Sequence, residues 1–288
     1  MAQLFKCLQA NVQHSKAGSY LLGKRILDER IYIALIQESW VTSRGRINGL
    51  SNLPGKVISL GYGESPRSCI FVRNTIDISV LTGFCSRDVT SNLVKLPLEM
   101  GTKELVICSA YFPGDTMFPP PNEVRKLVAF CRGKNLQLLV ACDANSHHTT
   151  WDSTDINERG EYLFDFILEE ALFVLNRASV PTFVTKNWAE VLDTTLCLQY
   201  LSTKITDSRV SDTPSGSDHK NIQFNIELGG KPIQEYRNPR LTDWDGYKLS
   251  LQRNLRSINV NVNNHEDLER LANSIGQAIV SAYHENCR

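Results

Sequence analysis

The chain has 288 residues, which is enough for one large core or two modest domains. Its hydrophobic fraction of 42% and charged fraction of 22% are ordinary for a soluble globular protein, and no apolar run reaches membrane-spanning length, so we expect no membrane association. The 31 basic and 31 acidic side chains cancel, which excludes a chain-wide field that would attract nucleic acid, and any contact with a polyanion must come from a local basic face.

None of the eight cysteines forms a Cys-x-x-Cys pair, and most of them lie within apolar runs. We therefore expect reduced thiols in the core rather than a zinc cluster, which would need closer spacing. Reduced thiols suit a cytosolic or nuclear compartment. The N-terminal stretch is too short in apolar length for a signal peptide.

Short apolar runs predict a strand-rich main domain with few helices. In chain order, we expect strands at Leu4–Val12, Ile31–Ile36, Val57–Leu60, Ser68–Val72, Ile76–Leu81, Leu93–Leu98, Leu105–Ala110, Leu136–Cys142, Thr182–Thr185, Val191–Cys197 and Asn221–Leu228. Helices are expected around Tyr20–Ile26, Asn122–Cys131 and Arg159–Ala171. This is not a regular strand–helix alternation, and it favours two packed sheets with helices outside, in the α/β (α+β) class.

The segment Gly229-Gly230-Lys231-Pro232 marks a domain boundary. After it, helices are expected at Asp243–Leu255 and Glu266–His284, the second with an apolar stripe. A tail of about sixty residues with two helices cannot bury much surface alone. It must therefore pack on the main domain, on a partner or on a neighbouring domain.

Polar residues follow several of the expected strands. Asp143 and Asn145 emerge on the same side of a buried strand, where a carboxylate can orient or deprotonate water and an amide can hold a phosphoryl oxygen. His147 and His148 follow, but adjacent side chains of an extended segment point apart, so packing or an indirect contact is expected rather than a shared ion.

Asp193 lies inside an apolar strand, where a carboxylate is costly unless it is paired. His219, in the quartet Ser217-Asp218-His219-Lys220, is a natural partner, because carboxylates fix the orientation and tautomer of imidazole. Such a pair can be structural or functional. Glu38 follows another strand and is placed to hold Mg²⁺, although a solvated loop acid is the simpler interpretation of this residue alone.

Asn11 and Tyr111 end two further strands, where an amide and a phenol can bind a phosphate oxygen or act as cap and turn residues. Taken together, these sites resemble the endonuclease/exonuclease/phosphatase superfamily, which includes DNase I and the exonuclease III type of apurinic endonuclease. The similarity runs from about residue 3 to residue 228, and Ser217-Asp218-His219 is its most specific element.

Smaller motifs resemble the endonuclease domain of non-LTR retrotransposons of the R1 and jockey type. They are Gln13-His14-Ser15, Asn145-Ser146-His147-His148 followed by Trp151, Arg159-Gly160, Pro181-Thr182-Phe183, and the tail segment Arg237–Asp245. The resemblance implies a four-layer αββα sandwich of two mostly antiparallel sheets. It implies a catalytic domain at 1–228 and a helical connector at 229–288 that would precede a reverse transcriptase.

The resemblance also implies roles for single residues. Glu38 would be the principal Mg²⁺ ligand, with Mn²⁺ as an alternative ion and Asp218 at or near the metal. Asp143 would orient and activate the attacking water, with Asn145 beside it. Asp193 and His219 would form a pair at the scissile phosphate.

Asn11 and Tyr111 would hold phosphate oxygens, and Ser217 and Thr182 would support the phosphate site. The reaction would be hydrolysis of one DNA phosphodiester, leaving a 3′ hydroxyl that primes reverse transcription at the target. The implied partners are double-stranded DNA and the reverse transcriptase domain of the same polyprotein. The expected location is nuclear.

Two positions depart from the pattern of relatives. Gln13 stands where cellular apurinic endonucleases usually carry an acid, which weakens a repair role. Glu190 precedes Asp193 where many relatives carry a small polar residue, and we expect this glutamate to lie near the DNA surface and alter target contacts.

Target choice is expected in a hairpin made of Thr182–Thr185 and Val191–Cys197, with Lys186, Asn187 and Trp188 at its tip. A basic and aromatic tip can enter a DNA groove, whereas the alternative is that Trp188 folds back onto the core. Candidate phosphate contacts elsewhere are Arg44, Arg46 and Arg67, each of which can also be a solvated surface charge.

Two other functions stay open. A phosphatase on the same fold would act on an inositol phosphate or a lipid, but its substrate-loop signatures are not evident. A catalytically silent module that binds nucleic acid or protein would be favoured by the loss of a catalytic side chain, yet all the expected positions are occupied.

Overall fold

The computed structural model describes residues 2–287 except residues 44, 51, 62–63, 177–179, 230–241, 259–261 and 263. The chain divides into two compact units, Met1–Gly230 and Lys231–Arg288. Most of the expected boundary segment, the first part of the connector motif and Arg44 lie outside the described residues. Among the helices of the described part, none is long and apolar enough to cross a membrane.

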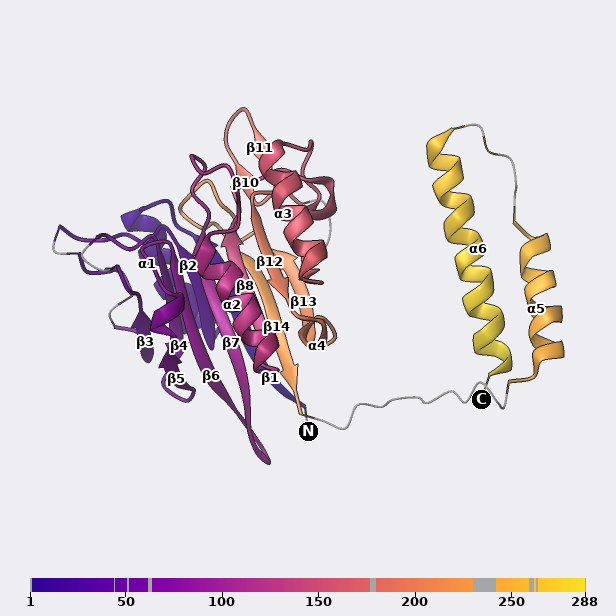
Figure 1. Cartoon of the computed structure of the whole chain (residues 1–288), viewed down its shortest axis with the longest axis horizontal. Helices are drawn as coiled ribbons and strands as arrows, with labels where there is room; N and C mark the ends of the chain where they lie inside the picture. The colour runs from indigo at the N-terminus through magenta and orange to yellow at the C-terminus, as the bar shows by residue number, and fades with distance from the viewer. Residues whose placement is uncertain are drawn as a thin grey trace. The chain divides into compact units, whose positions relative to one another are not determined.

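Unit 1 contains two six-stranded sheets (Figure 1). The first has the order β13-β14-β1-β2-β4-β3. Its strands are β1 (Gln3–Asn11), β2 (Ile33–Gln37), β3 (Gly55–Ile58), β4 (Ser68–Arg73), β13 (Ile205–Val210) and β14 (Ile222–Leu228). Because β1 and β2 run parallel, their last residues, Asn11 and Gln37, lie opposite each other at one end of the sheet.

The second sheet has the order β5-β6-β7-β8-β12-β9. Its strands are β5 (Asp77–Val80), β6 (Val89–Leu98), β7 (Gly101–Tyr111), β8 (Leu138–Asp143), β9 (Phe173–Val174) and β12 (Asp193–Cys197). β7 and β8 run parallel, with Tyr111 opposite Asp143 at their ends. A separate two-stranded ribbon pairs β10 (Phe183–Val184) with β11 (Ala189–Glu190).

The strand residues alternate between two buried faces. In β1, Phe5 and Cys7 belong to the core between the sheets, whereas Leu8 and Ala10 pack with α1 (Lys16–Asp28) on the outer face. The outer face of the second sheet is covered by α2 (Asn122–Gly133) and α3 (Glu158–Glu169), and a short helix, α4 (Gln199–Ser202), follows β12. The predicted four-layer αββα sandwich is therefore confirmed (Figure 1).

The sequence pattern missed some strand segments that are polar or very short. β13 and β9 were not expected, and β6 begins at Val89 rather than Leu93 because Thr90, Ser91 and Asn92 are buried polar residues inside the sheet. In β13 only Ile205 is buried, and a register shift interrupts the pairing between Thr206 and Arg209, so the strand shows no apolar alternation. The eight cysteines, all of which lie in the described part of the chain, form no disulfide and are buried, as expected.

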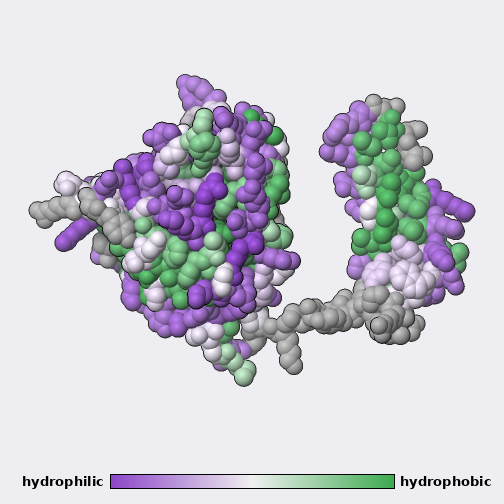
Figure 2. Space-filling model, in the orientation of Figure 1, coloured by the Kyte–Doolittle hydropathy of each residue, from purple (hydrophilic) through white to green (hydrophobic). Residues whose placement is uncertain are grey.

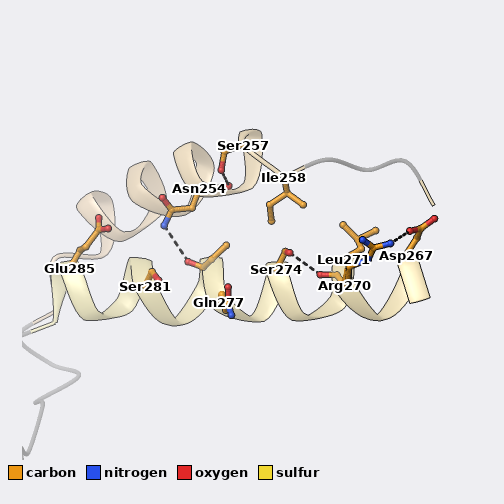
Figure 3. Close-up of a pocket in the computed structure, with 11 residues that line it drawn as sticks. Asn254, Ser257, Ile258, Asp267, Arg270, Leu271, Ser274, Gln277, Ser281 and Glu285 are labelled. Carbon is orange, nitrogen blue, oxygen red and sulfur yellow. Dashed lines mark hydrogen bonds and ion pairs between the residues drawn. The ribbon is translucent and has the colours of Figure 1, made fainter. Parts of the chain in front are cut away.

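Unit 2 is a pair of helices, α5 (Trp244–Arg256) and α6 (His265–Asn286). A groove of about 650 Å³ between them is lined mostly by polar residues, together with Ile258 and Leu271, and the Asn254 amide donates to the Ala278 carbonyl over 3.4 Å (Figure 3). Large apolar side chains of both helices, including Leu249, Leu268 and Ile279, stay exposed (Figure 2). The helix pair thus buries little apolar surface of its own.

Candidate active site

The two sheets bring the predicted polar residues to one end of unit 1. Asn11 ends β1, Glu38 follows β2, Tyr111 ends β7 and Asp143 ends β8. β12 runs antiparallel to β8 with Asp193 opposite Asp143, so its first residue lies at the same end. Strand polarity therefore gathers side chains that are far apart in the sequence.

At the centre of this site, two buried pairs lie beside each other. The Asn11 side-chain amide donates to Asp143 Oδ2 over 2.8 Å, and Asp193 Oδ2 lies 2.8 Å from His219 Nδ1. The ligand atoms of Asp143, Asp193 and His219 lie within 4.8 Å of one another. Asp193 Oδ1 is buried without a hydrogen-bond partner, so this carboxylate has unused capacity to accept a proton donor or bind a cation.

Burial and neighbouring charges shift the pKa values of Asp143 and His219 at this centre. Burial, followed by the neighbouring Asp193 carboxylate, raises the pKa of Asp143 to about 7. Burial lowers the pKa of His219, but the Asp193 carboxylate outweighs it and raises the pKa to about 9. Such strongly perturbed groups in contact are typical of functional sites.

Glu38 lies next to this centre in a fixed backbone position. Its φ is +49°, its amide donates to the Arg67 carbonyl over 2.6 Å, and its carbonyl accepts from the His14 amide over 2.6 Å. His14 Nε2 lies 3.4 Å from Glu38 Oε1. Burial disfavours the charged form, but hydrogen bonds from His14 and Asn11 outweigh it and hold the pKa of Glu38 below its usual value.

Tyr111 and Arg67 stack at the edge of the site. The Arg67 guanidinium lies 4.6 Å from the centre of the Tyr111 ring and forms two hydrogen bonds with Asp88, of 2.5 and 2.6 Å. Its charge is therefore already paired, while its position beside Tyr111 stays compatible with the predicted phosphate contact. Burial, together with Glu38 and Asp143, raises the pKa of the Tyr111 phenol.

Two predicted phosphate-site hydroxyls are used internally. Ser217 Oγ contacts the carbonyl of Asn11 at 2.8 Å and also accepts from the His219 amide at 3.2 Å. Thr182 Oγ1 accepts from the amides of Leu192 and Asp193, at 3.1 and 3.0 Å. Both hydroxyls thereby fix the segments that carry the Asp193–His219 pair.

Asp218 is exposed, and its hydrogen bonds join it to Gln13 rather than to the residues at the centre of the site. Its amide donates to Gln13 Oε1 over 3.0 Å, and Gln13 Nε2 donates to Asp218 Oδ2 over 3.3 Å. Gln13, which stands where apurinic endonucleases usually carry an acid, thus holds Asp218 in place.

The hairpin beside the site differs from the expected one. Its arms are β10 and β11, whereas the residues from Asp193 onward belong to the main sheet, so the prediction of Val191–Cys197 as the second arm is wrong. Lys186 and Asn187 are exposed at the tip. Trp188 is 45% exposed, with its ring 5.2 Å from Phe183 and 5.8 Å from His147, so it neither projects freely nor enters the core.

Glu190 is buried, so the expectation that it lies at the surface near DNA is wrong. Its carboxylate accepts from the amide and hydroxyl of Thr154, at 3.0 and 2.5 Å, and from the Val191 amide at 2.8 Å. One of its carboxylate oxygens lies within 4.8 Å of a ring nitrogen of His147 and a carboxylate oxygen of Asp155. His147 and Asp155 are themselves paired at 2.5 Å. Glu190 therefore anchors the base of the hairpin to the loop after β8.

Sequence reasoning missed two glutamines that join the sheets below the site. Gln9 Nε2 donates to the Cys142 carbonyl over 3.0 Å, and Gln37 Nε2 donates to the Ala141 carbonyl over 3.1 Å. Both occupy inward positions in the alternation of β1 and β2, which is the signal that could have identified them. They tie the strand that carries Asp143 to the strands that carry Asn11 and Glu38.

The loop after β8 is held against the start of α3 by Asn157 and Gly160. Asn157 Oδ1 accepts from the amides of His147 and Gly160, at 3.1 and 2.8 Å. A Cβ on Gly160 would lie 1.7 Å from the His147 carbonyl oxygen, which explains the Arg159-Gly160 motif physically. His148 instead stacks on Phe164 at 4.2 Å, as a packing residue.

Gly160→Ala is expected to destabilise unit 1 by about 2 kcal/mol, because the new methyl group collides with backbone that cannot move freely. In an unhindered helix the same change would stabilise by up to about 1 kcal/mol. Gly133→Ala is the control, because a Cβ there meets no atom within 4 Å. Urea unfolding measures both variants, and equal stability of the two would contradict the close approach.

Comparisons with known proteins agree with this geometry. Residues 105–223 match the family model described as endonuclease-reverse transcriptase. No curated protein matches the chain. Among solved structures, the endonuclease domain of TRAS1, a telomere-specific non-LTR retrotransposon, is 25% identical with a TM-score of 0.63, and the match covers 78% of this chain and 98% of that one.

The AP endonuclease LMAP from Leishmania major is also similar, with 12% identity, a TM-score of 0.60 and coverage of 79% of this chain and 89% of that one. At this identity the likeness supports the fold. The family model and the TRAS1 domain show that the chain carries a DNase I-like endonuclease domain similar to that of non-LTR retrotransposons, and so a hydrolase domain.

Proposed function

We propose that this endonuclease domain nicks double-stranded DNA in a Mg²⁺-dependent reaction and leaves a 3′ hydroxyl that primes reverse transcription of a non-LTR retrotransposon. The observation that carries the proposal is the buried Asp193–His219 pair beside Asp143 and Asn11, at the shared end of two sheets. Phosphodiester cleavage places negative charge on the phosphate oxygens, and a fixed imidazole beside preorganised donors stabilises that charge.

Each side chain has a role that follows from its contacts. Asp143, held by Asn11 at 2.8 Å, orients and activates the attacking water. Asp193 fixes the ring of His219 through Nδ1, which leaves Nε2 to face the phosphate. Asn11 and Tyr111, at the ends of β1 and β7, hold phosphate oxygens, and Asn145 lies beside Asp143.

The residues present fit a hard divalent cation. Glu38 is an oxygen ligand with a lowered pKa, and Asp193 Oδ1 is a buried carboxylate oxygen without a partner. Glu38 would be the principal holder of Mg²⁺ or Mn²⁺, with Asp218 as an outer acid. When bound, the cation supplies charge stabilisation for the phosphate.

Aromatic contacts connect the hairpin tip to His219. Trp188 packs edge-on against Phe183, and Phe183 packs edge-on against His219 with ring centres 4.8 Å apart. The half-exposed tip with Lys186 and Asn187 is thus adjacent to the reacting group. We infer that this tip contacts the target DNA and influences the nick position.

Trp188→Ala is expected to weaken DNA binding about 10-fold, because stacking on a base is worth on the order of 1–3 kcal/mol. Nick positions mapped by sequencing should become less selective, while thermal unfolding changes little because the ring is 45% exposed. Tyr200→Ala, at an exposed aromatic residue on α4 beyond the other end of β12, is the matched control. Unchanged binding and unchanged nick positions would remove the tip from target recognition.

The test of the function is incubation of the purified chain with supercoiled plasmid in the presence of Mg²⁺ or EDTA. We expect nicked circles with Mg²⁺, 3′ hydroxyl ends that a polymerase extends, and no nicking with EDTA. Plasmid binding without nicking would instead support a silent binding module, and release of phosphate from an inositol phosphate would support a phosphatase. In the intact element we propose the reverse transcriptase domain as partner and the nucleus as the site of action.

A further inference from the structure

Arg159, the second residue of α3, reaches back from its helix to two loops of the site. Nε donates to the Asn145 carbonyl over 2.9 Å, and Nη2 donates to the Ala144 carbonyl over 3.2 Å. Nη1 donates to Thr116 Oγ1 over 3.4 Å. One planar guanidinium therefore joins the loop after β8 to the loop after β7.

These contacts matter because of the backbone of Asn145. Its φ is +46°, in the left-handed region that non-glycine residues adopt only when surrounding contacts hold them there. Its side-chain amide donates to the Phe112 carbonyl over 3.1 Å, and its backbone amide donates to Asp143 Oδ1 over 3.3 Å. The carbonyl of Asn145 is left to be held by Arg159.

All three acceptors of Arg159 are neutral oxygens, so none of them cancels its positive charge. Burial lowers the pKa of Arg159, and the nearby Asp115 and Asp143 oppose this. A guanidinium remains charged under such conditions. The side chain thus contributes a fixed cation and a three-point geometry, which a lysine ammonium cannot reproduce.

We propose that Arg159 is a positioning residue for DNA cleavage, which holds Asn145 in its left-handed conformation and fixes the spacing between the loops that follow Tyr111 and Asp143. The inference rests on the proposed nicking activity, because it assigns Arg159 to the same reaction. It predicts a loss of turnover rather than of DNA binding, since Arg159 acts through Asn145.

The experiment compares Arg159→Ala and Arg159→Lys with wild type in plasmid nicking. We expect kcat to fall about 100-fold in both variants, as for a misplacement of about 1 Å, with KM changed less than 3-fold. Millimolar guanidinium added to Arg159→Ala should recover part of kcat. The control is Arg132→Ala, in the last turn of α2, where the arginine contacts Glu170 just after α3. This variant should nick like wild type.

A kcat within 3-fold of wild type in Arg159→Ala, or a loss that lies wholly in KM, would overturn the proposal. If wild type itself does not nick, the proposed function fails, and a readout without cleavage decides the inference. The side-chain amide signals of Asn145, assigned from their absence in Asn145→Asp, should shift in Arg159→Ala and stay in place in Arg132→Ala. Unshifted signals in Arg159→Ala would also overturn it. If Arg159→Ala does not fold, Arg159→Lys carries both measurements.

Discussion

His219→Ala is expected to lower the rate of Mg²⁺-dependent plasmid nicking by about 10³-fold. The imidazole is 4% exposed and bound through Nδ1 to Asp193, so its loss leaves the phosphate without an oriented ring. Asp193→Asn should reduce the rate by about 10²-fold or more, because the amide no longer fixes the tautomer and charge of the ring. Initial rates of nicked-circle formation measure both effects.

The same pair predicts an effect on stability. Removing one partner leaves the other buried without its counter-charge, so Asp193→Ala should cost about 3 kcal/mol, whereas the double variant with His219→Ala should cost less than the sum of the two single changes. His265→Ala, at a histidine 85% exposed in unit 2, is the control for loss of an imidazole. Full nicking by His219→Ala would exclude the pair from the reaction.

The fold was predictable wherever hydrophobic burial alone determined a strand. β2 and β8 are continuous apolar runs because both of their faces are covered, and the sequence pattern located them within two residues. β13 escaped because an edge strand with a register shift does not need apolar residues on both faces. The beginning of β6 was not predicted because Thr90 is a polar residue that is buried with a hydrogen bond to Ser68. A hydropathy pattern does not detect a buried polar residue of this kind.

The site was predictable from strand ends, but its connections were not. Asn11 and Asp143 could be placed near each other because each ends a buried strand, and the two sheets pack with these strand ends on the same side. The error about Glu190 has a specific cause. Its partner Thr154 lies 36 residues earlier in a loop, and no local pattern reveals that this loop returns to bury the carboxylate. Arg159 appeared only as part of a motif, since its acceptors are backbone carbonyls, which any sequence provides.

Glu38→Gln is expected to abolish metal-dependent nicking, with a loss of at least about 10²-fold at 1–10 mM Mg²⁺. The substitution keeps the shape of the side chain and one acceptor oxygen but removes the charge that the lowered pKa of Glu38 maintains. Titration of Mn²⁺ by electron paramagnetic resonance in the absence of DNA measures binding without requiring cleavage. Glu104→Gln, at a residue 44% exposed that pairs with Lys95 on β6, is the matched control.

The titration also distinguishes two places for the ion, because candidate ligands occur at Glu38 and in the group of Asp143, Asp193 and His219. If Glu38 is the principal ligand, Glu38→Gln raises the Kd for Mn²⁺ about 10-fold or more and Asp143→Asn raises it less, since removing a direct carboxylate ligand costs more than removing a neighbouring charge. The opposite order would place the ion between Asp143 and Asp193, where Asp193 Oδ1 has no protein partner. In that arrangement the cation would bind Asp193 Oδ1 while His219 stays on Oδ2, and its positive charge would weaken the attraction between the Asp193 carboxylate and the protonated imidazole. A site centred on Glu38 leaves the pair intact, and this is the physical reason to expect the first result.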